Sequence, residues 1–262
     1  MAATGVNNQM ADERFSTTLS SRLQDQYGSD KIRLHCNRDF LDEDSLEVSP
    51  DIILDVAKEL QVELPFLMDI CGVDYPERSK RFEVVYHLAN PFEKKRLRIK
   101  VPLAEKESLS SLTSVYKTAN WFEREAYDMF GISFIGHPNL RRILCHEDFV
   151  GHPLRKDYPA DRRQSSTTPL EHSFAEDRKR MMQEETDYLS DRVWINIGPA
   201  HPATHGTLRF MAVLRGETIE SVDIEIGYLH RCFEKMAETH TYKQVIPYTD
   251  RLNYCSAPLN NH

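Results

Sequence analysis

The stretch RFEVVYHLANPFEKKRLRIKV, residues 81–101, contains two runs of residues with the patterns of β-strands. RFEVVYHL (81–88) is rich in apolar and β-branched residues, while KRLRIKV (95–101) alternates basic with apolar residues. Such runs are typical of strands that pack one face on a core. Between them lies NPFEKK, whose Asn90-Pro91 pair favours a turn. The stretch therefore predicts a β-hairpin.

The residues before this hairpin predict two helices and a further strand. KIRLHCN (31–37) is strand-like, whereas FSTTLSSRLQDQYG (15–28) and SPDIILDVAKELQ (49–61) space their apolar residues as helices do. Together these patterns predict an α+β domain with helices and a mostly antiparallel sheet over residues 16–160. Residues 1–15 are polar and are expected to form a flexible tail.

The chain changes character after this domain. Residues 161–192 are rich in charge, Ser and Thr, which predicts a linker. RVWINI (192–197) and TLRFMAVLRGETIESVDIEI (207–226) then predict strands, and GYLHRCFEKMAETH (227–240) has a helical pattern. Residues 193–262 are few for a domain, so we expect them to be the start of a larger, truncated one.

Composition excludes several classes of protein. The formal net charge is −8, whereas nucleic-acid binding favours a basic surface. The sequence contains no apolar run of eighteen residues and no signal-peptide pattern at its N-terminus. None of its five cysteines forms a C-x-x-C pair, so we expect reduced thiols and no zinc or iron–sulfur site in the chain.

The run NWFEREAYDMFG, residues 120–131, predicts a helix. Asn120 and Glu123 have the spacing of a capping box, and Gly131 is expected to end the helix. The favoured interpretation is a surface helix with a solvated charged face. That face would consist of Glu123, Arg124, Glu125 and Asp128. A catalytic pair of Glu125 and Asp128 is the alternative, although no nucleophile or metal ligand lies nearby in the sequence.

A basic cluster follows this helix. GHPLRKDYP (151–159) together with Arg141 and Arg142 concentrates four basic side chains in an acidic protein. A phosphate site would need a glycine-rich loop opening a helix, so we favour a surface that docks another subunit. His137 and His152 each lie in a Gly-His-Pro turn and are interpreted as structural residues of those turns, not as ligands.

The segment GPAHPATHG, residues 198–206, carries two histidines four residues apart. Pro202 directly follows His201 and opposes a regular helix through both histidines. The segment is therefore predicted to be a rigid loop between two strands. Two interpretations stay open, a ligand-binding loop or a turn whose histidines satisfy backbone groups. No Cys, Asp or Glu accompanies them at ligand spacing, so no metal site is expected.

Two sets of motifs resemble a known family. EREAYDMFGISFIGHPNLRRIL (123–144) with GHPLRKDYP is similar to the signature of the C subunit of bacterial NADH:quinone oxidoreductase, respiratory complex I. INIGPAHPATHG (195–206), IEIGYLHRCFEKMAE (224–238) and IPYTDRLNY (246–254) resemble the start of the D subunit, which carries the quinone site. Their order resembles a C/D fusion, which implies that the second domain begins a fold like that of the hydrogenase large subunit.

The resemblance implies the site residues. His205 and Tyr254 match the family's histidine and tyrosine at the quinone headgroup, and Arg251 matches an arginine near the terminal iron–sulfur cluster of a neighbouring subunit. Imidazole N–H and phenol O–H groups are donors that suit the two carbonyl acceptors of a quinone. His201 belongs to the same implied pocket and is expected to shape the loop.

The function implied is that of a peripheral-arm subunit of a proton-translocating NADH:quinone oxidoreductase, on the cytoplasmic side of the bacterial inner membrane. The implied partners are the cluster-bearing B and I subunits and the membrane arm. NADH and the iron–sulfur clusters would belong to partner subunits, so this chain would bind no cofactor and would be inactive alone. The substrate would be a quinone, with ubiquinone and menaquinone both open.

Two alternatives to this function stay open. One is a related membrane-bound nickel–iron hydrogenase, but Asn253 and Ser256 occupy the positions of its nickel-binding cysteines. Cys255, which lies between those positions, is a lone thiolate that cannot chelate nickel in the same way. The other alternative is a purely structural docking subunit. A departure from the family is Cys232, where its members mostly carry glycine.

Overall fold

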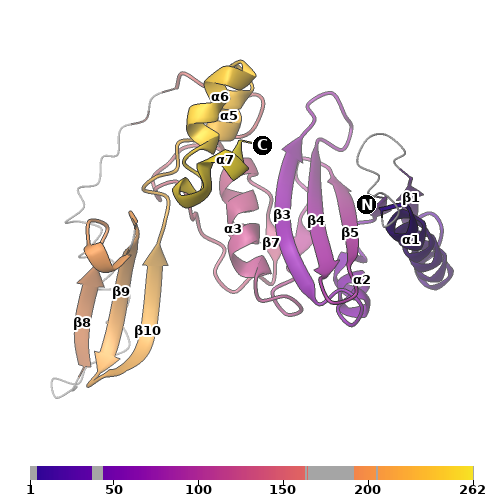
Figure 1. Cartoon of the computed structure of the whole chain (residues 1–262), viewed down its shortest axis with the longest axis horizontal. Coiled ribbons are helices and arrows are strands. Elements are labelled where there is room, and N and C mark those ends of the chain that lie inside the picture. Colours follow the sequence, from indigo (N-terminus) through magenta and orange to yellow (C-terminus); the bar gives the residue numbers. More distant parts are fainter. Residues whose placement is uncertain (1–4, 37–43, 163, 165–191, 205, 262) are drawn as a thin grey trace. The chain divides into compact units, whose positions relative to one another are not determined.

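The computed structural model describes residues 5–36, 44–162, 164, 192–204 and 206–261. The chain forms two compact units, which are described separately (Figure 1). The first contains the residues up to Arg142 together with His152–Pro159, and the second contains Ile143–Gly151 and the residues from Ala160 onward. Most of the linker predicted over residues 161–192 lies outside the described residues.

The first unit is built on a five-stranded sheet in the order β1-β2-β5-β4-β3. All neighbouring strands are antiparallel except β2 and β5, so the prediction of a mostly antiparallel sheet is confirmed. The predicted hairpin is β4–β5, in which Asn90 lies opposite Lys95. The strands are β1 (Ile32–His35), β2 (Ser45–Val48), β3 (Phe66–Asp74), β4 (Phe82–Asn90) and β5 (Lys95–Leu103).

One face of this sheet carries the apolar core. In the β4–β5 register Tyr86 lies opposite Ile99 and Val84 lies opposite Val101, and all four side chains are buried. Three helices complete the unit, α1 (Gly5–Tyr27), α2 (Ile53–Leu60) and α3 (Ala119–Phe130). Helix α3 packs beside β3 and α1 beside β1 (Figure 1). Helix α1 thus begins inside the stretch that was predicted to be a flexible tail.

Strand β3 was not predicted, because Asp69 and Gly72 interrupt its apolar residues. It lies at the edge of the sheet, and its register against β4 shifts between Leu67 and Asp69, so that both Leu67 and Ile70 are buried in the core although they are three residues apart. Strand β2 and a short parallel pair were also missed. That pair is β6 (Leu109–Ser110) with β7 (Phe134–Ile135).

The second unit contains the three predicted strands, arranged as an antiparallel sheet in the order β10-β9-β8. They are β8 (Arg192–Ile197), β9 (Arg209–Arg215) and β10 (Thr218–Glu225). The other elements among the described residues of this unit are short, namely η1 (Pro202–Thr204), α5 (Phe233–Ala237), α6 (Tyr242–Thr249), η2 (Tyr254–Ser256) and α7 (Ala257–Asn260).

The helix predicted over residues 227–240 is wrong for most of its length, since only Phe233–Ala237 is helical. Gly227 has a φ of 99°, and a turn joins the N–H of His230 to its carbonyl at 2.9 Å. Cys232 adopts left-handed backbone with a φ of 50°. These two interruptions delay the start of the helix to Phe233. Within the described ranges, no helix combines the length and apolar character needed to cross a bilayer.

Candidate functional site

Helix α3 carries the motif of the first unit and ends as predicted. Gly131 adopts the left-handed conformation with a φ of 76°, and its N–H bonds to the carbonyl of Tyr127. The predicted capping box is wrong, because the helix begins at Ala119. The Glu123 carboxylate instead accepts hydrogen bonds from the Leu112 N–H at 2.7 Å and the Ser111 hydroxyl at 2.6 Å.

The predicted solvated face of this helix is also wrong. Glu123 and Asp128 are 0% exposed, and Arg124 is buried as well. Arg124 donates to the carbonyls of Arg141 and Arg142, while the Arg142 Nη1 lies 2.6 Å from an Asp128 oxygen. These charged residues therefore attach the segment after the helix to the helix itself, and Asp128 is committed to an internal ion pair.

Burial also affects the protonation of Glu123. It raises the pKa of this carboxyl to about 7, although the hydrogen bonds from Ser111 and Leu112 oppose the shift. A carboxyl in this position is largely protonated in mildly acidic solution. Ser111 and Leu112, rather than solvent, supply hydrogen bonds to the two oxygens of this carboxyl.

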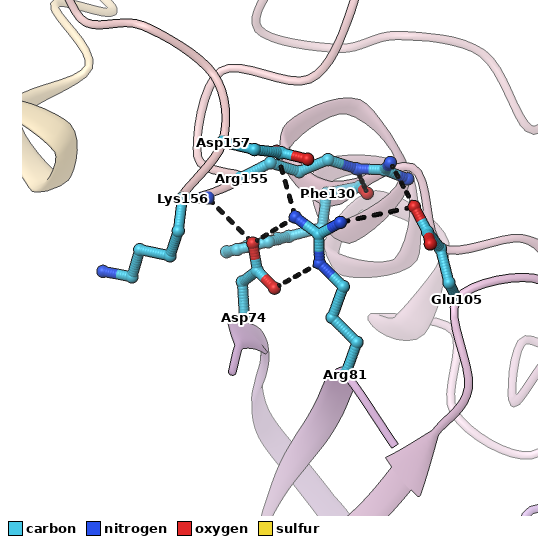
Figure 2. A network of polar contacts seen from close by, with 7 residues as sticks. All are labelled: Asp74, Arg81, Glu105, Phe130, Arg155, Lys156 and Asp157. Atoms are coloured by element: carbon cyan, nitrogen blue, oxygen red, sulfur yellow. Dashed lines mark hydrogen bonds and ion pairs between the residues drawn. The ribbon is translucent and has the colours of Figure 1, made fainter. Parts of the chain in front are cut away.

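The basic segment of residues 152–159 also turns inward. Figure 2 shows Arg81, the residue directly before β4, surrounded by carboxylates from three different segments. These are the side chains of Asp74, Glu105 and Asp157. Its guanidinium lies 2.8 and 2.9 Å from the two oxygens of Asp74 and 3.0 Å from Asp157. Arg155 donates to the carbonyl of Phe130 at 2.6 Å. Arg155 and Arg142, two of the four basic residues of the predicted docking surface, are thus engaged by internal contacts, and docking through this cluster stays a prediction.

Asp74 is the centre of this network. Its side chain is fully buried and also accepts the backbone N–H of Lys156 at 2.8 Å (Figure 2). Burial favours the neutral carboxyl, but the hydrogen bonds from Arg81 and Lys156 outweigh it and lower the pKa of Asp74. The charged form is thereby secured inside the first unit.

The two histidines in Gly-His-Pro turns have the structural role predicted for them. His137 Nδ1 accepts the Asn139 N–H at 3.0 Å and its Nε2 contacts the Asn120 carbonyl at 2.9 Å. His152 Nδ1 donates to the Asp128 carbonyl at 3.0 Å. Burial lowers the pKa of both imidazoles, which favours their neutral form.

The segment GPAHPATHG lies in the second unit, where it is a loop between β8 and β9, as predicted. Gly198 has a φ of 91°, and a Cβ there would collide with the carbonyl of Leu208, so this position requires glycine. The Thr204 hydroxyl lies 2.7 Å from the carbonyls of His201 and Gly206. These contacts hold the tip of the loop together.

The predicted site residues fall into two groups. His201 is exposed, and its Nδ1 accepts the Ala203 N–H at 3.1 Å, as expected for a residue that shapes the loop. Arg251 is exposed beside the carbonyl of Pro247. His205 and the side chain of Tyr254 lie outside the described residues, so their convergence on one ligand stays a prediction.

Arg251 lines an open pocket in the helical part of the second unit. The Arg231 guanidinium lies over the ring of Tyr248, 5.5 Å from its centroid, and gives the pocket a second positive charge. The lining residues are Arg231, His240, Gln244, Pro247, Tyr248 and Arg251. Over the described part of the chain, no three His, Cys, Asp or Glu side chains gather closely enough to hold a metal ion.

Arg209, which lies at the base of the loop, was not predicted from the sequence. It is buried, and its guanidinium donates to Asn196 at 2.8 Å and to Glu225 at 2.8 Å. The signal was present in TLRFMAV, where Arg209 precedes Met211 and Val213 on the inward-facing side of the strand. An arginine at the first position of an otherwise apolar series indicates a buried charge with dedicated partners.

Comparisons with known proteins agree across both units. Residues 46–164 match the family described as respiratory-chain NADH dehydrogenase, 30 kDa subunit. The C/D subunit of the NADH-quinone oxidoreductase of Bdellovibrio bacteriovorus is 56% identical over 216 residues, which cover 82% of this chain and 38% of that protein. The C/D subunit of Ectopseudomonas mendocina is 37% identical over 277 residues, covering 97% of this chain and 45% of that protein.

A solved structure gives a weaker likeness. A chain of the membrane-bound sulfane sulfur reductase, an archaeal respiratory membrane complex, matches 66% of this chain with 20% identity and a TM-score of 0.46. This likeness is too low to support an argument. The chain spans less than half the length of the two C/D relatives, 38% and 45%. From the match of residues 46–164 and the alignments that continue through both units, the chain belongs to the family of C/D subunits of NADH-quinone oxidoreductase.

Proposed function

We propose that this chain is part of a peripheral-arm subunit of a proton-translocating NADH:quinone oxidoreductase, and that its second unit helps to form the quinone-reduction pocket. The observation that carries the proposal is the alignment with the C/D subunit of Ectopseudomonas mendocina, which covers 97% of this chain and so includes the loop GPAHPATHG. The exposure of His201 on that loop supports a surface open to a ligand.

His205 and Tyr254 would hold the quinone headgroup from two distant positions in the chain. Reduction of a quinone to a quinol adds two electrons and two protons, and the protons go to the two carbonyl oxygens. The electrons would arrive from iron–sulfur clusters of partner subunits. An imidazole titrates near neutral pH and is quickly reprotonated, whereas a phenol with a pKa of about 10 releases its proton less readily. Both are donors that stabilise developing charge on the oxygens.

Arg251 would face the terminal cluster of a neighbouring subunit, where a fixed positive charge favours reduction. The second unit would be the beginning of a fold like that of the hydrogenase large subunit, extended by further helices. The cluster-bearing B and I subunits and the membrane arm would be its partners, on the cytoplasmic side of the inner membrane. This chain would contribute no bound cofactor.

The first unit would serve as the scaffold of the assembly. Its most characteristic charged residues, Glu123, Asp128 and Asp74, are buried among internal partners and are not available to a substrate. Residues with such surroundings secure a shape. Docking of other subunits would therefore use the outer surface that this internal network supports.

Substitutions of His205 and Tyr254 in the intact enzyme complex test the proposal. His205→Ala and Tyr254→Phe are expected to lower quinone reduction by roughly 10²-fold, the lower range for loss of a proton donor. NADH oxidation by an artificial acceptor should persist, because that reaction uses partner subunits only. Tyr242→Phe is the matched control, since Tyr242 is 95% exposed in the same unit. Unchanged quinone turnover in both site variants would contradict the proposal.

A further inference from the structure

The loop GPAHPATHG rests on a buried arginine that belongs to none of the motifs recognised in the sequence. Arg209 is the first residue of β9 and lies three residues after Gly206, yet only 1% of its surface is exposed. A guanidinium keeps its charge at every physiological pH, so its burial is tolerated only with a complete set of partners. The neighbouring strands supply these partners.

The contacts of Arg209 cross the whole three-stranded sheet. Its Nε donates to the Oδ1 of Asn196 on β8 at 2.8 Å, and its Nη1 contacts Glu225, the last residue of β10, at 2.8 Å. Its Nη2 lies 2.8 Å from the sulfur of Met211. One planar cation therefore ties together the three strands at the end where the loop leaves the sheet.

The hydrogen-bond chain continues beyond the arginine on both sides. The Tyr228 hydroxyl donates to the same Glu225 oxygen at 2.6 Å. Burial is the main reason why the pKa of Tyr228 is raised to about 12, and this hydrogen bond adds to the effect. On the other side, the Nδ2 of Asn196 donates to the carbonyl of Gly198 at 3.2 Å. This series of hydrogen bonds thus ends at the carbonyl of Gly198, the first residue of the loop.

The hydrogen-bonded pair of Asn196 and Arg209 holds both ends of the loop. Asn196 anchors the start of the loop through Gly198, while Arg209 is itself the residue at which the loop ends. Gly198 also packs directly on the carbonyl of Leu208, so the two ends touch. Displacement of the guanidinium would therefore shift both anchor points of the loop at once.

We propose that Arg209 is the positioning residue of this loop: held between Asn196 and Glu225, it fixes where both ends of the loop leave the sheet and so where the loop meets the quinone. The inference rests on the proposed function, because it assigns to the loop the quinone described above. Arg209 acts through the loop and is not a catalytic residue.

The geometry also explains why arginine occupies this position. The three directions in which Arg209 donates lie in the plane of one rigid fork, toward β8, β10 and Met211. A lysine ammonium carries three donors on a flexible stem and cannot hold the same spread of partners at fixed angles. Lysine is therefore expected to replace the charge without replacing the positioning.

Quinone kinetics of the intact complex test the inference. The variants are Arg209→Lys, Arg209→Met and Asn196→Asp, with turnover normalised to NADH oxidation by an artificial acceptor. We expect the KM for a short-chain quinone to rise about tenfold or more in Arg209→Met and less in Arg209→Lys, since a misplaced donor loop weakens productive binding. A merely structural residue would change the amount of assembled complex and leave this KM unchanged.

Asn196→Asp separates the loop from the sheet. Aspartate keeps an acceptor for Arg209, so the sheet is preserved, but it loses the donor to the Gly198 carbonyl. A raised quinone KM with normal assembly is expected, and this variant keeps the inference testable if Arg209→Met fails to assemble. The matched control is Arg215→Met, on the same strand at its far end, where an exposed guanidinium pairs with Glu220 at 2.8 Å.

The outcomes separate the two proposals. A normal quinone KM in Asn196→Asp and in whichever Arg209 variants assemble would overturn the positioning role, even if the His205 variants behave as proposed. A raised KM in Arg215→Met equal to that of Arg209→Met would overturn it as well. If His205→Ala and Tyr254→Phe both leave quinone turnover unchanged, the proposed function itself fails, whatever the Arg209 variants show.

Discussion

The buried carboxylates of the first unit and the predicted site residues of the second unit have opposite surroundings. In the first unit, the carboxylates of Asp74, Glu123 and Asp128 are buried, and each has partners from another segment of the same unit. In the second unit, His201 and Arg251 are exposed, and their contacts are to nearby backbone. Polar residues thus build a scaffold in one region and lie on an open surface in the other.

Solvation accounts for the difference. Removing a charge from water costs several kcal/mol unless a partner and further hydrogen bonds compensate for it. A side chain that has met this requirement inside the fold is no longer free to bind a ligand. An exposed imidazole or guanidinium keeps its water, which a ligand or a partner subunit can later displace. Burial with complete internal partners therefore distinguishes a scaffold motif from a site motif.

Removal of the central carboxylate of the first unit should give the largest effect. Asp74→Ala leaves the Arg81 guanidinium, only 14% exposed, without its bidentate partner. Breaking a buried pair on one side costs about 3–5 kcal/mol, because the remaining charge stays desolvated. The free energy of unfolding of the purified chain, measured by urea denaturation, is expected to fall by this amount.

A surface pair supplies the matched control. Lys31 and Asp51 also lie within hydrogen-bond distance, at 2.5 Å, but both side chains are substantially exposed. Exposed pairs contribute little, since water replaces the lost partner. Asp51→Ala should therefore barely change the urea midpoint. Equal losses from Asp74→Ala and Asp51→Ala would remove the energetic basis of the comparison.

The features that the sequence predicted correctly are those that depend on local patterns. The β4–β5 hairpin, the three strands of the second unit and the helix end at Gly131 follow from local patterns, namely apolar alternation, β-branched residues and glycine conformation. Each of these features depends on residues close together in the chain. They were predicted because the relevant information was local.

The burial of the charged face of α3 is not local information. Glu123 meets Ser111, and Asp128 meets Arg142, on segments whose approach to the helix depends on the tertiary fold. On their own, these residues look like a solvated helix face. The sequence likewise placed GPAHPATHG in a loop, but it did not reveal the burial of Arg209, whose partners Asn196 and Glu225 lie on two other strands.

A pH titration of Glu123 would sharpen the comparison, with an effect of intermediate size. The pKa of this carboxyl is about 7 in the fold, above its usual value of 4.5, because burial disfavours the charged form. The folded state thus binds the proton more tightly than the unfolded state. The stabilisation is complete below pH 4.5 and is lost as the pH rises through 7.

Glu123→Gln cannot ionise, and its amide fits the same partners because the Ser111 hydroxyl can accept as well as donate. Relative to wild type, the variant should gain up to about 3 kcal/mol in unfolding free energy between pH 4.5 and pH 8. Urea midpoints at several pH values measure this change. A difference between the two proteins that is constant with pH would contradict a buried, neutral Glu123.

Packing at two glycines gives a smaller difference between the units. A Cβ on Gly72 of β3 would lie 2.5 Å from the Phe130 ring, whereas a Cβ on Gly206 of the loop would meet no atom within 4 Å. Overpacking a core contact costs about 1–3 kcal/mol. Gly72→Ala should lower the thermal midpoint of the purified chain, and Gly206→Ala should leave it near the wild-type value. A larger loss at Gly206 would mean that the loop is as tightly packed as the scaffold.

The smallest effect is expected at the tip of the loop. The Thr204 hydroxyl lies 2.7 Å from the carbonyls of His201 and Gly206, but it has one proton and donates to one of them at a time. Thr204→Val keeps the shape and removes this single bond, so the free energy of unfolding should fall by only about 0.5–1.5 kcal/mol. Quinone turnover in the intact complex should nevertheless decline, because the bond joins Thr204 to His201 or Gly206 in the loop that is proposed to meet the quinone. A variant with wild-type turnover would show that the anchors at the base of the loop, Asn196 and Arg209, are sufficient to position it.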